Sequence, residues 1–247
     1  FSPNGQRLAV AGGIPGEVGQ IEIWDWTGKV LVKSIAVHHD SVMQVAWSSD
    51  EQYVATASFD GSCGVCDVAT GSLVARFQGH SKPVLTLCYW SADQLLSAGI
   101  DQSIRGWKGL DGAEHRSLVN HVGTVRVVLP QPQFTTLSSR RLISMGEDKT
   151  VRLWQPEIGR LIRFQRMPSV PSAGVWAPGT EVVLVGCENG VLYRLQSDSL
   201  EVVGEGDTKV GIVHAIVVHP TTGQIAVAGQ KGLSMERSDP IDSKDAN

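Results

Sequence analysis

The sequence predicts an all-β fold of four-stranded antiparallel sheets, about six of which fall within its 247 residues. The first observation is a short phrase with a Trp-Asp-like ending that recurs at nearly constant spacing. Its clear copies are Ile-Glu-Ile-Trp-Asp at 21–25, Cys-Gly-Val-Cys-Asp at 63–67, Ile-Arg-Gly-Trp-Lys at 104–108 and Val-Arg-Leu-Trp-Gln at 151–155. With two weaker copies, the tryptophan column falls at Trp24, Cys66, Trp107, Trp154, Leu195 and Arg237, in steps of 42, 41, 47, 41 and 42 residues. A period of about 40–45 residues is typical of stacked β-sheet repeats.

The second observation is that each repeat contains about four short apolar runs, and the third is that turn residues separate them. In the second repeat, the expected strands A to D lie at 42–47, 53–57, 63–66 and 73–77. The third repeat places them at 84–89, 94–98, 104–107 and 116–119, and the fourth at 125–129, 141–144, 151–154 and 161–164. The fifth places them at 173–176, 182–185, 192–195 and 201–203, and the sixth offers 213–218 and 225–228.

Both ends of the repeat array look incomplete. The first repeat lacks most of strand A, the last lacks strand D, and after Gln230 the phrase is hardly recognisable. Two insertions are expected in loops, at 12–19 between strands B and C of the first repeat and at 130–139 between strands A and B of the fourth. We therefore expect one repeat domain over 1–237, a polar tail over 238–247, and a chain that is a fragment of a larger protein.

The composition argues against two classes of partner. With 21 basic and 25 acidic residues the formal charge is −4, which does not favour binding to a nucleic-acid backbone. The apolar runs are short, well below the roughly 18 residues of a membrane-spanning helix.

A His/Ser/Asp constellation recurs in successive repeats and imitates a hydrolase triad. A hydroxyl residue always stands four positions before the aspartate, and the tryptophan column stands six positions after it. The sets are His38, Thr56 and Asp60; His80, Ser97, Asp101 and Trp107; and His121, Ser144, Asp148 and Trp154. One catalytic triad per structural unit is not expected of an enzyme, so these sets are interpreted as structural.

These phrases and sets resemble the WD40-repeat β-propeller family over essentially the whole chain. The resemblance implies four-stranded blades, of which about six are visible, the first and last incomplete. It also implies that each set is a buried hydrogen-bond chain running from Trp through Ser or Thr and His to Asp. Such a chain ties the loop between strand D and the next strand A to the turn between strands B and C, and it rigidifies a fold.

The resemblance also implies a partner-binding face. In this family, partners usually contact the third and fifth residues after the blade histidine and the residue just before the aspartate. From these columns we expect contacts at Met43, Phe59, Leu85, Ile100, Arg126, Glu147 and Glu188. Apolar residues beside charged ones are typical of a protein-binding surface, although the same residues could simply line a channel mouth.

The sequence offers two weak metal or redox motifs. Cys63 and Cys66 match C-x-x-C, but residues three apart on a strand point to opposite faces, so plain packing is expected. In His38-His39-Asp40, His38 belongs to the structural set, and the remaining imidazole and carboxylate form a weak ligand set. We therefore expect no cofactor and no metal.

The expected function is that of a non-catalytic propeller acting as a protein–protein interaction scaffold within a multidomain protein. The alternative is a propeller enzyme with a metal or redox site in the central channel. The phrases at 1–13 and 213–220 look most like bacterial members of the family, some of which are fused to a c-type cytochrome module. The sequence does not decide between a cytoplasmic and a periplasmic location.

Overall fold

The computed structural model describes residues 1–132 and 134–236, and strands dominate it throughout. Position 237 of the tryptophan column and the expected tail at 238–247 lie outside the described residues. By contact density the chain divides into two compact units, one comprising residues 1–148 with 152–162 and the other 149–151 with the chain from Arg163 onward. Each unit is described by itself. No helix in the described part is long and apolar enough to cross a membrane.

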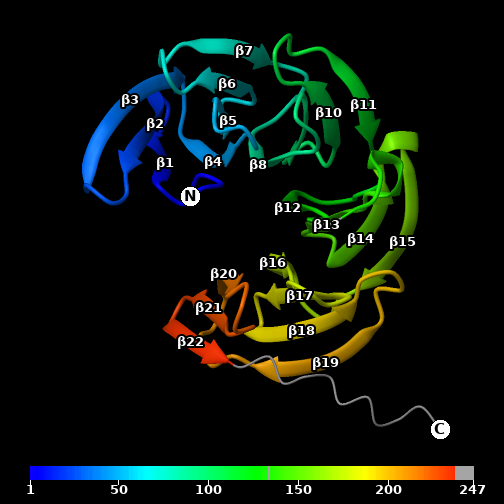
Figure 1. The fold of residues 1–247 in the computed structure, drawn as a ribbon. Helices are drawn as coiled ribbons and strands as arrows, with labels where there is room; N and C mark the ends of the chain where they lie inside the picture. Colours follow the sequence, from blue (N-terminus) through cyan, green and yellow to red (C-terminus); the bar gives the residue numbers. More distant parts are fainter. Residues whose placement is uncertain (133, 237–247) are drawn as a thin grey trace, which may run out of the picture. The chain divides into compact units, whose positions relative to one another are not determined.

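The first unit begins with three sheets whose strands follow one another in chain order (Figure 1). The first sheet has three strands: β1 (Arg7–Ile14), β2 (Val18–Asp25) and β3 (Val30–His38). The second has four: β4 (Val42–Trp47), β5 (Tyr53–Ser58), β6 (Cys63–Asp67) and β7 (Leu73–Phe77). The third also has four: β8 (Val84–Tyr89), β9 (Gln94–Gly99), β10 (Ile104–Lys108) and β11 (Glu114–Leu118).

The fourth sheet has the same up-and-down order, and the division between the units passes through its last two strands. It contains β12 (Val125–Pro130), β13 (Leu142–Gly146), β14 (Thr150–Gln155) and β15 (Arg160–Arg166). The expected loop insertion is present between β12 and β13 and contains a short 3-10 helix, η1 (Leu137–Ser139). A second short 3-10 helix, η2 (Pro156–Ile158), joins β14 to β15.

The second unit continues with a fifth, four-stranded sheet and a sixth, three-stranded sheet. The fifth contains β16 (Pro171–Trp176), β17 (Val182–Cys187), β18 (Val191–Gln196) and β19 (Val202–Asp207). The sixth contains β20 (Val213–Val218), β21 (Ile225–Gly229) and β22 (Gly232–Glu236).

The predicted class is confirmed: the fold is all-β, and its first and last sheets have three strands instead of four in the described part. One detail is wrong. The insertion at 12–19 is not a loop, because β1 and β2 pair along its length and close in a short turn after Ile14. The weak sixth copy of the phrase forms β22, which pairs with β21 through Glu236 opposite Ile225.

Apolar side chains fill the spaces between neighbouring sheets within each unit. Ile21 and Ile23 of the first sheet pack with Val54 and Cys66 of the second. Trp107 of the third sheet packs with the second, and Trp154 of the fourth packs with the third. The column residue of a sheet therefore faces the sheet before it, and burial of these faces is the main favourable contribution to the stability of the fold.

Candidate functional site

The recurring polar sets form hydrogen-bond chains in the third and fourth sheets. In the third, the indole Nε1 of Trp107 lies 3.1 Å from Ser97 Oγ, Ser97 Oγ lies 2.8 Å from His80 Nε2, and His80 Nδ1 lies 2.9 Å from Asp101 Oδ2. Because an indole N–H can only donate, the chain of donors runs from tryptophan to aspartate through a histidine protonated on Nδ1.

The fourth sheet repeats this geometry almost atom for atom. Trp154 Nε1 lies 2.8 Å from Ser144 Oγ, which lies 2.7 Å from His121 Nε2, and His121 Nδ1 lies 2.9 Å from Asp148 Oδ2. In both sheets the aspartate also accepts a backbone N–H from the residue after the histidine, Ser81 or Val122. The aspartate thus joins the loop before strand A to the turn after strand B.

The second sheet carries a different version of the same set. His38 Nε2 lies 2.7 Å from Thr56 Oγ1, and His38 Nδ1 lies 3.1 Å from Asp60 Oδ2. With Cys66 in the tryptophan column, no indole reaches Thr56, whose hydroxyl oxygen lies 3.2 Å from the carbonyl oxygen of Gly64. All the hydroxyl and histidine side chains of the three sets are buried.

Arg76 completes the set of the second sheet, and the sequence did not single it out. Its Nη1 donates to Ser62 Oγ at 2.9 Å and its Nη2 to the carbonyl oxygen of Val37. Arg76 pairs with Gly64 across β6 and β7. Gly64 stands in the column that holds Arg105 and Arg152, two arginines within 4 Å of the aspartates of their own sheets. A glycine where the third and fourth repeats have arginine was the available signal for a substitute cation.

The sequence also missed a hydroxyl two residues after the aspartate. Ser62 Oγ donates to Asp60 Oδ1 at 2.7 Å, and Ser103 Oγ donates to Asp101 Oδ1 at 2.8 Å. Burial opposes ionisation of Asp60, but hydrogen bonds from Ser62 and the His39 backbone outweigh it and lower the pKa of Asp60 to about 2. Burial likewise opposes ionisation of Asp101, yet the bonds from His80 and Ser103 hold its pKa below the usual value. Both carboxylates are therefore fixed acceptors, which makes them poor candidates for proton transfer near pH 7.

The two cysteines of the C-x-x-C motif face opposite sides of the second sheet. Cys63 packs towards the third sheet and Cys66 towards the first, and both are free thiols. Burial raises the pKa of the Cys63 thiol to about 12 and that of Cys66 to about 11. Such thiols are protonated at neutral pH and behave as small apolar side chains.

The expected partner-contact residues in strand A all lie at one recurring backbone feature. The pairing of strands A and B skips one residue near the start of every strand A, and the skipped residues are Met43, Leu85, Arg126, Ser172 and His214. A β-bulge of this kind takes the extra residue out of the register of the two strands and re-aims its side chain. Met43 is 47% exposed, whereas Leu85 and Arg126 are half-buried.

The expected contact residues before each aspartate lie at the same end of their sheets. The backbone N–H of Phe59 donates to Ser41, that of Ile100 to Pro83 and that of Glu147 to Thr124. Each bond places the residue beside the segment that leads into the bulge of its own sheet. In the fourth sheet the two columns also meet through side chains, because Arg126 Nη2 lies 2.7 Å from Glu147 Oε1.

We name these six positions of the first unit the loop-edge surface: Met43, Phe59, Leu85, Ile100, Arg126 and Glu147. Phe59 is 43% exposed and Ile100 is half-buried, so the second and third sheets contribute an apolar part. Hydrogen bonds from Thr124 and Arg126 lower the pKa of Glu147, which keeps the fourth sheet's part charged. Glu188 occupies the equivalent position in the second unit, where its backbone N–H donates to Val170.

Comparison with known proteins identifies the class of protein. The family model described as "WD domain, G-beta repeat" matches residues 29–67 and 71–108. The chain of a solved structure entitled "Crystal Structure of Mitotic Checkpoint Complex" superposes with a TM-score of 0.86 at 21% sequence identity, covering 97% of this chain and 73% of that one. The chain thus has the fold of that WD40 β-propeller neighbour, and the family model places two WD40 repeats within residues 29–108.

Among its relatives is "COMPASS component SWD3" of Saccharomyces cerevisiae, 29% identical over 166 residues that cover 66% of this chain and 49% of that protein. Another is "Ribosome biogenesis protein WDR12 homolog" of Ixodes scapularis, 33% identical over 130 residues that cover 51% of this chain and 29% of that protein. The chain thus spans half the length of these curated relatives or less. Both are eukaryotic, so the expected similarity to bacterial members and the cytochrome fusion are not supported.

Proposed function

We propose that this chain is a non-catalytic scaffold that binds a protein partner through the loop-edge surface. The observation that carries the proposal is the β-bulge that recurs in every strand A of the described sheets. It takes Met43, Leu85 and Arg126 out of the register between strands A and B, at the sheet end where Phe59, Ile100 and Glu147 also lie. The names of the relatives support the same class, since one is a component of COMPASS and a similar fold occurs in the mitotic checkpoint complex.

The distribution of side chains on the loop-edge surface fits a protein ligand. Partly exposed apolar residues on the second and third sheets can be desolvated by a partner's apolar side chain. The Arg126–Glu147 ion pair is exposed on the fourth sheet and suits the polar rim that surrounds such a contact. We infer that the partner presents an apolar anchor to Phe59 and Ile100 and polar groups to Arg126 and Glu147.

The polar sets support this function by holding the surface in place. Each aspartate binds the loop that leads into strand A and sits directly after a surface residue, as Asp60 follows Phe59 and Asp101 follows Ile100. A fixed backbone lowers the ordering cost of binding. No observation favours the alternative of a metal or redox enzyme, since the described residues include no cluster of three or more metal-ligating side chains.

The test is a double substitution, Phe59→Asp with Ile100→Asp, in the natural full-length protein. Partners captured by the wild-type protein from a native extract are identified, and their binding is then measured with purified components. The matched control is Val74→Asp with Leu110→Asp, which changes exposed apolar residues of the same two sheets away from the loop-edge surface. We expect the first pair to weaken binding by about tenfold or more and the second pair to have little effect. Equal binding by both double variants would place the partner site elsewhere.

A further inference from the structure

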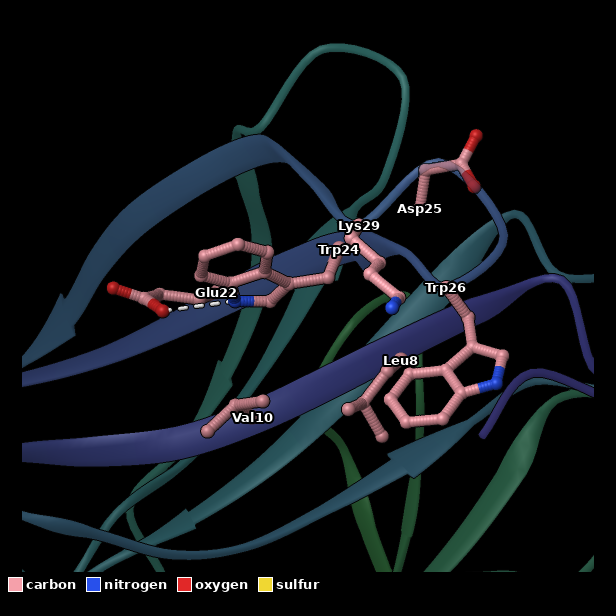
Figure 2. Close-up of a pocket in the computed structure, with 7 residues that line it drawn as sticks. All are labelled: Leu8, Val10, Glu22, Trp24, Asp25, Trp26 and Lys29. Atoms are coloured by element: carbon pink, nitrogen blue, oxygen red, sulfur yellow. Dashed lines mark hydrogen bonds between the residues drawn. The ribbon is translucent and has the colours of Figure 1, made fainter.

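Two indole groups of the first unit donate to glutamates and not to a serine hydroxyl. Trp24 Nε1 lies 2.9 Å from Glu22 Oε2, and both residues belong to β2 (Figure 2). Trp90 Nε1 lies 2.6 Å from Glu157 Oε1, but here the acceptor comes from η2 of the next sheet. Trp90 is fully buried, so its bond joins the third sheet to the fourth inside the first unit.

A small cavity of about 30 Å³ lies beside the Trp90–Glu157 bond. Trp90 and Glu157 line it together with Gln94 of β9 and Arg116 of β11. All four residues belong to the first unit. Gln94 begins β9 whereas Ile100 follows its end, so the cavity lies at the opposite end of the third sheet from the loop-edge surface.

Two polar atoms of the lining residues are buried without a partner. Neither Gln94 Oε1 nor Arg116 Nε makes a hydrogen bond within the described residues. The amide oxygen can only accept, and the guanidinium N–H can only donate. Buried polar groups are nearly always paired, and each one left unpaired destabilises the fold. A single molecule that both donates and accepts can satisfy both atoms from this cavity.

The size and charge of the cavity select that molecule. A water needs roughly 10–15 Å³ and about two to four polar partners, so a cavity of about 30 Å³ accommodates a water and little else. Arg116 and Glu157 place opposite charges on the lining, and burial lowers the pKa of His115, which also lines the cavity, below its ordinary value. A cation would therefore lie against Arg116 and an anion against Glu157, whereas a neutral molecule meets neither conflict.

We propose that this cavity is the binding site of one ordered water molecule, which accepts from Arg116 Nε and donates to Gln94 Oε1. The water fixes the guanidinium, whose Nη2 donates to the Glu157 carbonyl oxygen at 2.7 Å and so joins β11 to η2. Bridging waters of this kind are part of a fold, and they replace direct hydrogen bonds at little cost.

The joint between the first and second sheets makes the same contact with a lysine. Lys33 and Arg116 both pair with the residue just before the tryptophan column. Lys33 Nζ donates to the carbonyl oxygen of Ala69, which, like Glu157, stands three positions after that column. A lysine has no donor along its stem, so it makes the contact without a second polar atom to satisfy. Arg116→Lys should accordingly keep the bond between the sheets and lose the water.

The test is a high-resolution crystal structure of the natural full-length protein, with crystals also soaked in bromide. We expect one water peak within hydrogen-bonding distance of Gln94 Oε1 and Arg116 Nε, and no anomalous signal from bromide there. The peak should be lost in Gln94→Met, which keeps the side-chain length but removes the acceptor, and in Arg116→Lys. The matched control is Gln52→Met, at an exposed glutamine just before β5, which should leave the peak unchanged.

A direct bond between Gln94 and Arg116, or an empty cavity in the wild-type protein, would overturn the water site. A bromide signal would also overturn it and assign the cavity to an anion, with the amide of Gln94 turned to present its N–H groups. A peak that persists in both Gln94→Met and Arg116→Lys would show that neither atom holds the water, which contradicts the proposal. None of these outcomes involves the loop-edge surface, so the water site and the proposed function can fail separately.

Discussion

The second and third sheets hold the same histidine in the same place by different means. In the third, the indole N–H of Trp107 donates to Ser97 and so begins the hydrogen-bond chain. The Trp107 ring also stacks on Phe77, with ring centroids 5.3 Å apart and ring planes at 9° to one another. In the second, Cys66 fills the column, and Arg76 reaches the histidine network from the outer strand instead. The difference shows that these two sheets share the same histidine–aspartate pair while the partners around it are exchanged.

The exchange also moves stabilisation from packing to polar contacts. Trp107 is fully buried and contributes a large apolar area, whereas Cys66 contributes a small one. Arg76 is partly exposed, with 27% of its side chain accessible, so its contacts are partly screened by water. We therefore expect the third sheet to be more sensitive to loss of its column residue than the second.

The largest effect is expected for Trp107→Ala. The substitution empties a fully buried site, ends the stack on Phe77 and leaves Ser97 without its indole donor. Urea unfolding should show a loss of about 3–5 kcal/mol. The matched change Cys66→Ala in the second sheet should cost about 1 kcal/mol. Similar losses in the two variants would mean that the column residue contributes equally to the free energy of unfolding in both sheets.

A smaller loss is expected for Asp101→Ala and Asp148→Ala. Each removes the acceptor of a buried histidine and of a loop N–H, and unpaired buried donors cost about 1–3 kcal/mol. Thermal unfolding should therefore occur several degrees lower in both variants, by about 2–4 °C for each kcal/mol. Asp93→Ala, at an exposed aspartate of the third sheet, is the control and should change little. An unchanged melting temperature in both network variants would contradict the structural role of the sets.

The polar residues that recur in successive repeats could be predicted from the sequence, whereas a contact residue that occurs in one repeat, such as Arg76, could not. Ser97, Asp101 and Trp107 could be placed because their three columns recur at fixed offsets, and offsets along paired strands translate directly into register, whereas the spacing to the histidine varies between repeats. Arg76 could not be placed in this way. It acts across β6 and β7, where the pairing shifts register after Val65.

The partner-contact columns show the same limit. The family pattern supplied Met43, Leu85 and Arg126, but the physical reason for their position is a bulge, which is a feature of pairing and not of composition. The partner of the first sheet's column tryptophan was equally hidden. Trp24 matches its column perfectly, and only the structure shows that its indole is half-buried and bonded to Glu22.

The next effect, about 1–2 kcal/mol, is expected for Arg76→Met. Methionine keeps most of the apolar stem, so the change isolates the guanidinium bonds to Ser62 and the Val37 carbonyl. The loss should appear in urea unfolding and should exceed that of Arg160→Met, at an exposed arginine of β15. If the two arginine variants unfold alike, the set of the second sheet holds together without its substitute cation.

The smallest effect is a pH dependence that the second and fourth sheets share. Burial lowers the pKa of His38 and of His121 from the ordinary value of 6.5, although Asp60 and Asp148 partly oppose this. As the pH falls below about 6.5, these two histidines take up protons in the unfolded chain but not yet in the folded chain. The two groups therefore stabilise the fold above that pH.

Their contribution is lost as the pH falls from 6.5 through the lowered values. Asp60 adds a further loss of stability at lower pH, as the pH falls from 3.8, the ordinary pKa of an aspartate, towards about 2, the pKa of Asp60 in the folded chain. Urea midpoints measured between pH 8 and pH 5 should decline on acidification. The decline should be shallower in His38→Gln and in His121→Gln, each of which removes one of the two groups. A flat profile, or midpoints that rise below pH 6.5, would show that protonated histidine is accommodated beside Asp60 and Asp148, and that these pairs act as ion pairs in the folded state.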